Sequence, residues 1–134
     1  MELGLLDSDV DARHLSMKVG QLERHWEKNV LAIGLSQGFI EPLESTSIHL
    51  IQNSIIRFIK LFPSAGINPV EIEQFNREVR QEIEYIRDFI ILHYHVTERT
   101  DSEFWRRCRD MAIPESLQHR LDLFRESGLV FETE

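Results

Sequence analysis

The stretch NPVEIEQFNREVRQEIEYIRDFIILHYHV, residues 68–96, decides the fold because its pattern predicts one long helix. Asn68 is a natural N-cap, Pro69 suits the first helical position, and acidic residues follow where they complement the helix dipole. Core-facing positions then recur at helical spacing, at Ile72, Phe75, Val79, Ile83, Ile86, Ile90 and His93. The last turns, residues 89–96, are apolar nearly all round, so we expect this end of the helix to be enclosed.

A second helix is predicted upstream, beginning at Pro42 or Leu43. The residues of its core-facing stripe are spaced by three and four positions. They are Leu43, Ser47, Leu50, Ile51, Ser54, Ile55, Phe58, Leu61 and Phe62. Further isoleucines lie off that stripe, so this helix is apolar on more than one side and should pack against something larger. Residues 62–69, FPSAGINP, supply the break between the two helices.

Two shorter helices are predicted downstream. Asp101 is expected to cap the first, SEFWRRCRDM, residues 102–111. Pro114 is expected to open the second, ESLQHRLDLFRES, residues 115–127, which Gly128 is suited to end.

The N-terminal region predicts a small β portion. Residues 1–13 are acidic and without a clear period, which indicates a loose connection. HLSMKV, residues 14–19, alternates as a half-buried strand does, and VLAIGL, residues 30–35, is typical of a short buried strand. Between them, LERHWEKN, residues 22–29, is polar and predicts a turn or loop.

The predicted elements do not make a self-sufficient domain. Two short strands do not form a stable sheet by themselves, and the two long helices carry more apolar surface than this chain covers. We therefore expect a mainly α fold with a short β portion near the N-terminus, cut from a larger protein. A small helical domain, or a chain that covers its apolar excess by self-association, is the alternative.

Composition excludes several classes of function. At 134 residues the chain is one domain or a piece of one, and its formal net charge of -8 argues against nucleic acid as the main partner. The single cysteine, Cys108, cannot form an internal disulfide and suits a reducing compartment. The sequence shows no signal-peptide pattern and no apolar stretch near the roughly 20 residues of a membrane span, so we expect a soluble, cytoplasmic protein without a membrane partner.

No metal site or thiol chemistry is predicted. His93, His95 and Glu98 lie close together in the sequence, but residues two apart on a helix do not share a face. Cys108 has no neighbouring histidine in a nucleophile arrangement.

The segment GFIEPLESTSIHL, residues 38–50, admits two interpretations. Proline, acidic and hydroxyl residues are typical of a well-formed helix start. The free N–H groups of a helix start also bind anions, and Glu44 beside them would act as a base or position a cation, with hydroxyls from Thr46 and Ser47. The preceding GLSQG, residues 34–38, is more typical of turn glycines than of a nucleotide loop.

Aromatic residues are densest in HYHVTERTDSEFWRR, residues 93–107. Tyr94, Phe104 and Trp105 are equally consistent with the walls of a flat apolar pocket and with the filling of a corner between two helices.

Taken together, these segments resemble the flavin-dependent tryptophan halogenases. The resemblance is carried by WEKNVLAIGLSQGFIEPLESTSIHL (26–50), by FNREVRQEIEYIRDFIILHYHVTERTDSEFWRRCRDM (75–111) and by the FP break between the long helices. It implies an incomplete piece of an α/β flavoprotein monooxygenase-like fold with a helical substrate module. Residues 14–42 would then form a strand and loop part lining the flavin, and residues 43–134 the helical substrate module.

The resemblance also implies a chemistry and a set of site residues. Members of the family use reduced FAD, oxygen and chloride or bromide to make hypohalous acid, which a lysine and a glutamate aim at an electron-rich ring such as that of tryptophan. Glu44 matches that active-site glutamate, and Thr46 and Ser47 match the halide position beside the flavin. The segment that lines the flavin corresponds to Gly34, Gly38, Phe39, Glu41 and Pro42. The region that sandwiches the indole corresponds to Tyr94, Phe104 and Trp105.

This sequence departs from the family pattern in several places. It contains no GxGxxG loop, no WxWxIP motif and no counterpart of the catalytic lysine. Ser47 stands where some members carry glycine, and His93 where some carry tyrosine. We therefore predict the C-terminal segment of a halogenase that is inactive alone and binds no cofactor tightly alone.

Its expected partners are tryptophan or a similar aromatic substrate, the FAD module, a flavin reductase and a second copy of the chain. The alternative hypothesis is a non-catalytic helical module that binds a protein through exposed apolar helix faces. A gene product without function is a third.

Overall fold

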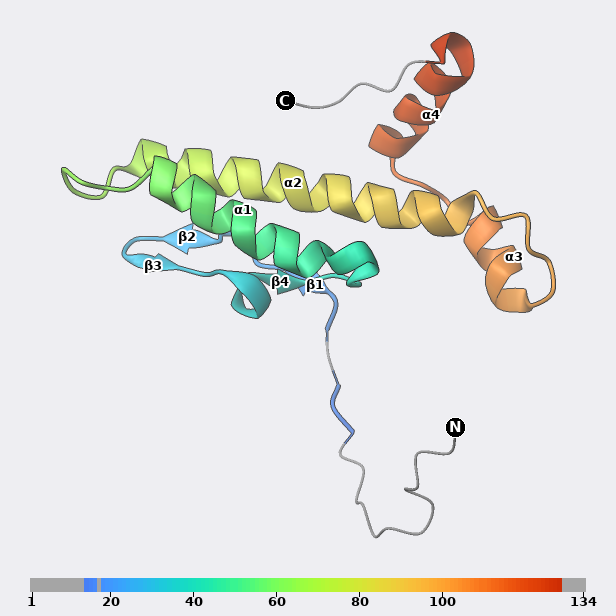
Figure 1. Ribbon diagram of the computed structural model, residues 1–134, viewed down its shortest axis with the longest axis horizontal. Helices are drawn as coiled ribbons and strands as arrows, with labels where there is room; N and C mark the ends of the chain where they lie inside the picture. Colours follow the sequence, from blue (N-terminus) through green and yellow to red (C-terminus); the bar gives the residue numbers. More distant parts are fainter. Residues whose placement is uncertain (1–13, 17, 129–134) are drawn as a thin grey trace, which may run out of the picture.

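Two antiparallel helices form the framework of the computed structural model, which describes residues 14–16 and 18–128 (Figure 1). α1 spans Thr46–Lys60 and α2 spans Pro69–His95. A short 3₁₀ turn, Leu43–Ser45, precedes α1, and the Asn68 side chain accepts the Val70 N–H at 2.9 Å as the N-cap of α2. Both long helices and the break between them are therefore confirmed.

Two small antiparallel ladders lie along one side of this helix pair (Figure 1). β1, Gly20–Gln21, pairs with β4, Gly38–Phe39, while β2, Trp26–Glu27, pairs with β3, Val30–Leu31. Each strand has two residues, so the β portion is short, as expected.

The predicted positions of the strands need correction. The strand expected over 14–19 is wrong: its described residues have no regular structure and β1 begins at Gly20, while Met17 lies outside the described residues. Val19 is 71% exposed, so among the described residues its apolar side chain has no surface that buries it. The buried strand expected over 30–35 is reduced to the two-residue β3, in which Val30 is exposed and Leu31 packs half-buried against the core. A 3₁₀ turn at Gly34–Ser36 follows.

The segment predicted as a polar loop, residues 22–29, instead supplies the centre of the core. Trp26 in β2 is 2% exposed and packs edge-to-face on Phe58 of α1 and Phe75 of α2, with ring centroids 5.5 and 5.7 Å apart. Ile72, Val79 and Ile83 complete the core cluster. The stripe predicted for α2 is therefore the core-facing stripe, although its exposed member His93 lies outside the core.

A buried asparagine joins α2 to β2. Asn76 is 3% exposed, and its Oδ1 accepts the backbone N–H groups of His25 at 2.7 Å and Trp26 at 2.8 Å. Its Nδ2 donates to the Trp26 carbonyl at 2.8 Å. One side chain thus satisfies three backbone groups that the short β2–β3 ladder leaves facing the helix.

Polar contacts also hold α1 against α2. Arg57 donates to Glu78 at 2.7 Å and lies 3.1 Å from a carboxylate oxygen of Glu82. Asn53 donates to the same Glu82 carboxylate. Arg57 and Glu82 are largely shielded from water. This network therefore fixes how α1 is aligned along α2, in addition to the apolar contacts between them.

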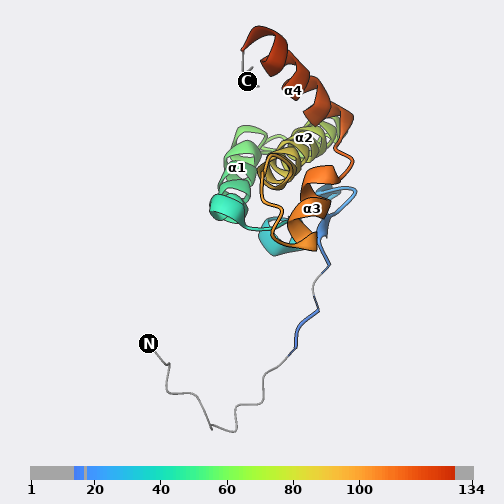
Figure 2. The same ribbon diagram turned by 90° about the vertical axis from the view of Figure 1, so that its right-hand side faces the viewer.

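Two short helices follow on different sides of the end of α2 (Figure 2). α3 spans Glu103–Asp110 and α4 spans Glu115–Ser127. The predicted cap at Asp101 is wrong by one residue, because the Ser102 hydroxyl accepts the Trp105 N–H while Asp101 pairs with Arg99 at 2.7 Å. Gly128 ends α4 with φ of 66°, as predicted.

The start of α4 is anchored to α2 through a buried carboxylate. Asp88 is 1% exposed, accepts from Arg87 at 2.7 Å and accepts the hydroxyl proton of Ser116. Leu117 is buried beside this contact. The bond to Ser116 therefore fixes where the last helix begins.

The enclosure expected for the end of α2 is not provided by the described residues. His93 and Val96 are exposed, and Phe89 is 41% exposed. On α1, the off-stripe residues Ile48 and Ile59 are about two-thirds exposed. Among the described residues, the apolar excess seen in the sequence thus remains uncovered, as expected of a piece of a larger fold.

We expect Gly38→Ala to lower the free energy of unfolding by about 1–3 kcal/mol, the usual range for overpacking. A Cβ at Gly38 would lie 2.7 Å from the Gly20 carbonyl oxygen and 2.9 Å from the Gln21 Cα, so β4 could not keep its distance from β1. Urea unfolding followed by circular dichroism measures the change. The matched control is Ser64→Ala in the exposed connection between α1 and α2, and equal stability of the two variants would contradict the prediction.

Candidate functional site

The turn before α1 holds two consecutive residues in the left-handed region. Glu44 has φ of 51° and ψ of 37°, and Ser45 has φ of 64° and ψ of 27°. Neither is a glycine, so each is strained by about 1–3 kcal/mol. Both side chains are exposed. The backbone therefore presents the Glu44 carboxylate outward, at the point where α1 begins.

The first turn of α1 offers N–H groups without a side-chain cap. In the described chain, the side chain of the N-cap residue Ser45 makes no capping hydrogen bond. Thr46 is buried, and its hydroxyl donates to the Glu41 carbonyl at 3.1 Å, which ties the start of α1 to the segment that follows β4. The Thr46 hydroxyl and the Thr46 N–H, which donates to the Leu43 carbonyl, are thus both engaged. No capping side chain occupies the N–H groups that follow in the first turn, where an anion can bind.

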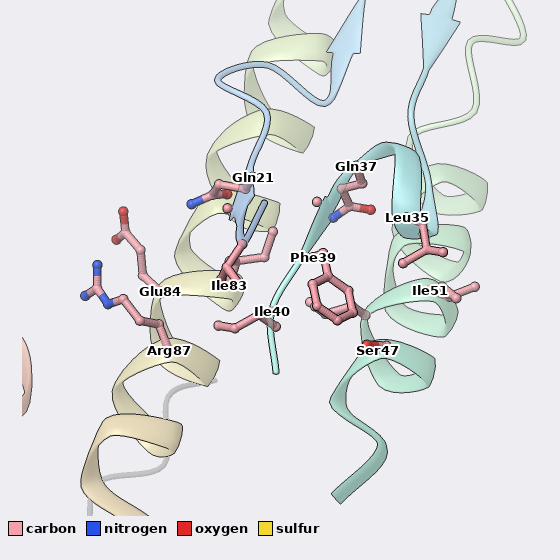
Figure 3. Close-up of a pocket in the computed structure, with 15 residues that line it drawn as sticks. Gln21, Leu35, Gln37, Phe39, Ile40, Ser47, Ile51, Ile83, Glu84 and Arg87 are labelled. Atoms are coloured by element: carbon pink, nitrogen blue, oxygen red, sulfur yellow. The ribbon is translucent and has the colours of Figure 1, made fainter. Parts of the chain in front are cut away.

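A cavity of about 210 Å³ lies between the start of α1, the middle of α2 and the β1–β4 ladder (Figure 3). Four of the predicted site residues line it, namely Gly34, Gly38, Phe39 and Ser47. Glu41 and Pro42, predicted in the same flavin-lining group, are exposed and lie outside its lining. The structure thus brings the two glycines and Phe39 together with the start of α1.

Both glycines of GLSQG are needed where they stand. Gly34 has φ of 71°, and a Cβ there would lie 3.4 Å from Ile51 of α1. Gly38 lets β4 run directly against β1. The turn-glycine interpretation is therefore correct for Gly34, whereas Gly38 lies in β4 and is needed for the close approach to β1. Both glycines line the cavity.

Sequence reasoning missed Gln37, which lies between these glycines. Gln37 is 3% exposed, lines the cavity, and accepts the Ser54 hydroxyl proton with its Oε1 at 3.1 Å. No sequence signal marks it, because a single glutamine in a turn is usually solvated.

The three predicted aromatic residues meet at the corner between α2 and α3. Tyr94 stacks on Trp105 with ring centroids 6.1 Å apart, and Phe104 packs edge-to-face on both rings at 6.2 and 4.9 Å. Arg99 lies over the Trp105 ring at 4.5 Å from its centroid. The rings fill the helix corner, and Phe104 remains 57% exposed, so the cluster also presents an aromatic surface.

Glu41 connects this aromatic corner to the strained turn. The Tyr94 hydroxyl donates to the Glu41 carboxylate, and this bond raises the pKa of Tyr94 because it stabilises the protonated phenol. The Glu41 carbonyl meanwhile accepts from Thr46. Glu41 therefore links two regions that lie 53 residues apart along the chain, a role that its position in the sequence does not reveal.

Metal-ligand geometry is not found among residues 14–16 and 18–128. No three histidine, cysteine or acidic side chains there come together in a way that could hold a metal ion. His93 instead packs near Phe89, with ring centroids 5.6 Å apart. Over the same residues, no helix combines the length and the apolar character that crossing a membrane requires.

The pattern that defines the tryptophan halogenases matches residues 3–134. The chain belongs to the tryptophan halogenase family. Within this family it is 37% identical to the 7-chloro-L-tryptophan 6-halogenase KtzR of Kutzneria sp., over 92% of this chain and 24% of that protein. It is 36% identical to the tryptophan 7-halogenase RebH of Lentzea aerocolonigenes, over 83% of this chain and 21% of that protein.

Solved structures of the family agree with the fold. Xcc4156, a flavin-dependent halogenase from Xanthomonas campestris, matches with a TM-score of 0.82 and 49% identity, over 94% of this chain and 27% of that chain. The family resemblance, the mainly helical fold and its character as a partial piece are thus confirmed. The chain spans about a quarter of the length of these family members.

Proposed function

We propose that this chain is the C-terminal segment of a flavin-dependent halogenase that acts on tryptophan or a related electron-rich aromatic compound. The observation that carries the proposal is the strained Glu44–Ser45 turn at the start of α1, in a chain of this family. Backbone strain of this kind concentrates at functional sites, where a side chain must be held in one place. The turn holds an exposed carboxylate beside a helix N-terminus.

Glu44 would act as the active-site carboxylate. An ionised carboxylate can accept a proton from the reacting ring or hold a cationic group in position. Because Glu44 sits on a strained turn between Pro42 and α1, its position is set by the backbone and not by a flexible loop. A halide ion would lie against the start of α1 at Thr46 and Ser47, attracted by the positive end of the α1 dipole. Because the Thr46 N–H already donates to the Leu43 carbonyl, the N–H groups that follow it would contact the ion.

The flavin would lie along the part of the chain formed by residues 14–42. The cavity fits the ring portion of such a group, since Phe39 offers it an aromatic face and Gly34 and Gly38 add no side chain to the lining. Glu41 and Pro42, outside the cavity, would border the flavin from the turn. When bound, reduced FAD would supply the two electrons that activate molecular oxygen, which is the oxidant that turns chloride or bromide into hypohalous acid.

The helical part, residues 43–134, would bind the aromatic substrate. Tyr94, Phe104 and Trp105 already share one cluster, and its exposed face offers ring surface on which an electron-rich ring can stack. The bond between Tyr94 and Glu41 keeps that cluster in a fixed relation to the turn that carries Glu44.

The proposed enzyme needs more than these 134 residues. The partner would be the FAD-binding part that makes up most of the length of the relatives, and a flavin reductase would supply the reduced cofactor. The exposed isoleucines of α1 are available to pack against that part. We therefore expect the chain alone to be inactive and to hold FAD weakly.

Joining the chain to the upstream part of Xcc4156 tests this proposal. We expect the joined protein to bind FAD and, with a flavin reductase and chloride or bromide, to add a halogen to tryptophan or indole, detected by mass spectrometry. The 134-residue chain and the upstream part are measured separately as controls. A folded joined protein that binds no FAD would contradict the proposal.

The second candidate is a non-catalytic module that binds a protein partner. The observation that favours it is the uncovered apolar surface of α1, where Ile48, Ile55 and Ile59 are exposed. The two candidates differ at Glu44, which a purely binding module would not need.

A further inference from the structure

One buried histidine connects the two small ladders to α2. His25 is 2% exposed, and its backbone is held on both sides, because its N–H donates to Asn76 of α2 at 2.7 Å and its carbonyl accepts the Ala32 N–H at 2.8 Å. Histidine is the side chain whose charge changes most readily near neutral pH. The state of this ring is therefore open to control by pH.

The His25 ring has a single hydrogen-bond partner among the described residues. Its Nε2 atom lies 3.2 Å from the Gln21 Oε1 atom in β1, whereas its Nδ1 atom is buried and makes no hydrogen bond. A neutral ring has one N–H donor, which Gln21 receives, so only an acceptor is left unmet. A charged ring has two N–H donors, and the second would have no acceptor in the buried space. The geometry thus favours the neutral ring.

The electrostatic surroundings act in the same direction. Burial lowers the pKa of His25, and the positive charge of Arg80 lowers it further. Arg80 is held in place, because its guanidinium donates to the Glu23 carbonyl at 2.7 Å. A proton taken up by His25 would therefore add a second buried positive charge close to Arg80.

The carboxylates of the neighbouring elements do not offset this charge, since none is hydrogen-bonded to the ring. Arg24 pairs with Glu27 at 2.7 Å and with Glu73 at 3.3 Å. The strands β3 and β4 contribute no titratable side chain. The remaining charged residues of this segment and of the facing side of α2 are Glu23, Lys28, Arg77 and Glu84.

The partner of the ring belongs to the wall of the cavity. Gln21 lines the cavity from β1, together with Gly20 (Figure 3). β1 is otherwise held by its two-residue ladder with β4 and by the bond from the Leu22 N–H to the Gln37 carbonyl at 3.0 Å. A ladder of this length is marginal by itself. Loss of the His25 contact should therefore free this segment more readily than it unfolds the helices.

We propose that His25 is a pH-sensitive contact, whose protonated ring moves into water and releases residues 20–22 from β4 and from the core. The proton comes from the solvent, and no covalent bond to a heavy atom changes. Release opens the cavity on its β1 side. The proposal does not rest on the proposed halogenase function.

The direction of the pH effect follows from proton uptake. In the closed form the pKa of His25 lies below its ordinary value of 6.5, which the ring regains when it is in water. The released form thus binds more protons, so the closed form is fully stable above pH 6.5 and loses stability as the pH falls below that value. The equilibrium constant for release rises by up to about tenfold for each pH unit, the limit for one proton.

Hydrogen exchange of backbone amides, followed by NMR on the 134-residue chain, tests the proposal. Protection of the Leu22 N–H, corrected for the intrinsic pH dependence of exchange, should fall at least about threefold from pH 7.0 to pH 5.5. Protection of the Val79 N–H, in the buried part of α2, should not follow it. His25→Phe keeps a flat ring that takes up no proton, so its Leu22 protection should stay constant. His119→Phe, at an exposed position of α4, should behave as the wild type.

Two further measurements do not depend on the folding of His25→Phe. His25→Gln is the second variant, because an amide does not titrate in this range and should likewise remove the pH dependence. In the wild type, the ring resonances of His25, assigned through its own backbone, should titrate with a midpoint below pH 6.5.

An equal loss of Leu22 protection in the wild type and in a folded His25 variant would overturn the proposal. A His25 midpoint at or above pH 6.5 would also do so. An equal loss of protection at Val79 would show that acid unfolds the chain as a whole, which contradicts a local release. Halogenation by the joined protein is read separately, so either proposal can fail without the other.

Discussion

Replacing Asn76 with leucine is expected to lower the free energy of unfolding by about 4 kcal/mol. Asn76 satisfies the N–H groups of His25 and Trp26 and the carbonyl of Trp26. Leucine has a similar size but no polar atom, so all three buried backbone groups would lose their partner. Each such group costs about 1–3 kcal/mol when left unpaired.

The expected loss is large because of where Asn76 acts. The Trp26 side chain is the centre of the core, between Phe58 and Phe75, and Asn76 fixes the backbone that carries it. The β2–β3 ladder, with two residues in each strand, is too short to hold that position by itself. Since small domains have a total stability of about 5–15 kcal/mol, this variant should be close to unfolding at room temperature.

Urea unfolding followed by circular dichroism, with tryptophan fluorescence as a second probe, measures the loss. The matched control is Gln81→Leu on the same helix, because the Gln81 amide makes only an exposed bond to Tyr85. That control should stay within about 0.5 kcal/mol of the wild type. If the free energy of unfolding of Asn76→Leu lies within about 1 kcal/mol of the wild-type value, the loss is that of one net hydrogen bond. That result would contradict the role of Asn76 in satisfying three buried backbone groups.

The sequence predicts the helices because their signals are local. The Asn68–Pro69 start, the spacing of Ile72, Phe75 and Val79, and the glycine at position 128 each report on neighbours within a few residues. Where two caps compete, the local signal is ambiguous by one residue. Asp101 and Ser102 are both good N-caps, and Arg99 decides between them by pairing with Asp101.

The β portion is poorly predicted because its partners lie far away in the sequence. Trp26 stands in a polar stretch that resembles a loop, and it becomes core only because Asn76, fifty residues later, binds its backbone. Conversely, residues 14–19 alternate like a strand, but Leu15 and Val19 remain exposed. An alternation of apolar and polar residues predicts a strand only where another part of the protein packs against its apolar side.

The candidate site is predicted in composition but not in geometry. The sequence marks Glu44, Phe39 and the aromatic residues near Trp105, yet it gives no indication of the left-handed backbone at Glu44 and Ser45. Gln37 escapes notice because its burial and its bond to Ser54 depend on how the turn folds onto α1. The connection of Glu41 to Tyr94 likewise arises from tertiary structure alone.

Changing Glu44 to glutamine in the joined protein is expected to lower the rate of halogenation by at least about 100-fold, the lower end of the range for a residue that transfers protons. Glutamine keeps the size of the side chain and suits the same exposed turn, so the strained backbone should persist. What is lost is the negative charge, with which Glu44 would accept a ring proton or hold a cationic group. The turnover number should therefore fall while the affinity for FAD changes little.

Two measurements separate this chemical role from a structural one. The FAD dissociation constant and the melting temperature of Glu44→Gln should match those of the parent protein, because the carboxylate is exposed and has no ion-pair partner among the described residues. Glu115→Gln, an equally exposed acid in the first turn of α4, is the matched control and should retain full activity. If Glu44→Gln halogenates at a rate within threefold of this control, Glu44 is not the active-site carboxylate, and the strain of its turn serves only to begin α1. If the rate falls 100-fold at unchanged FAD affinity, the strained turn positions the group that directs the chemistry.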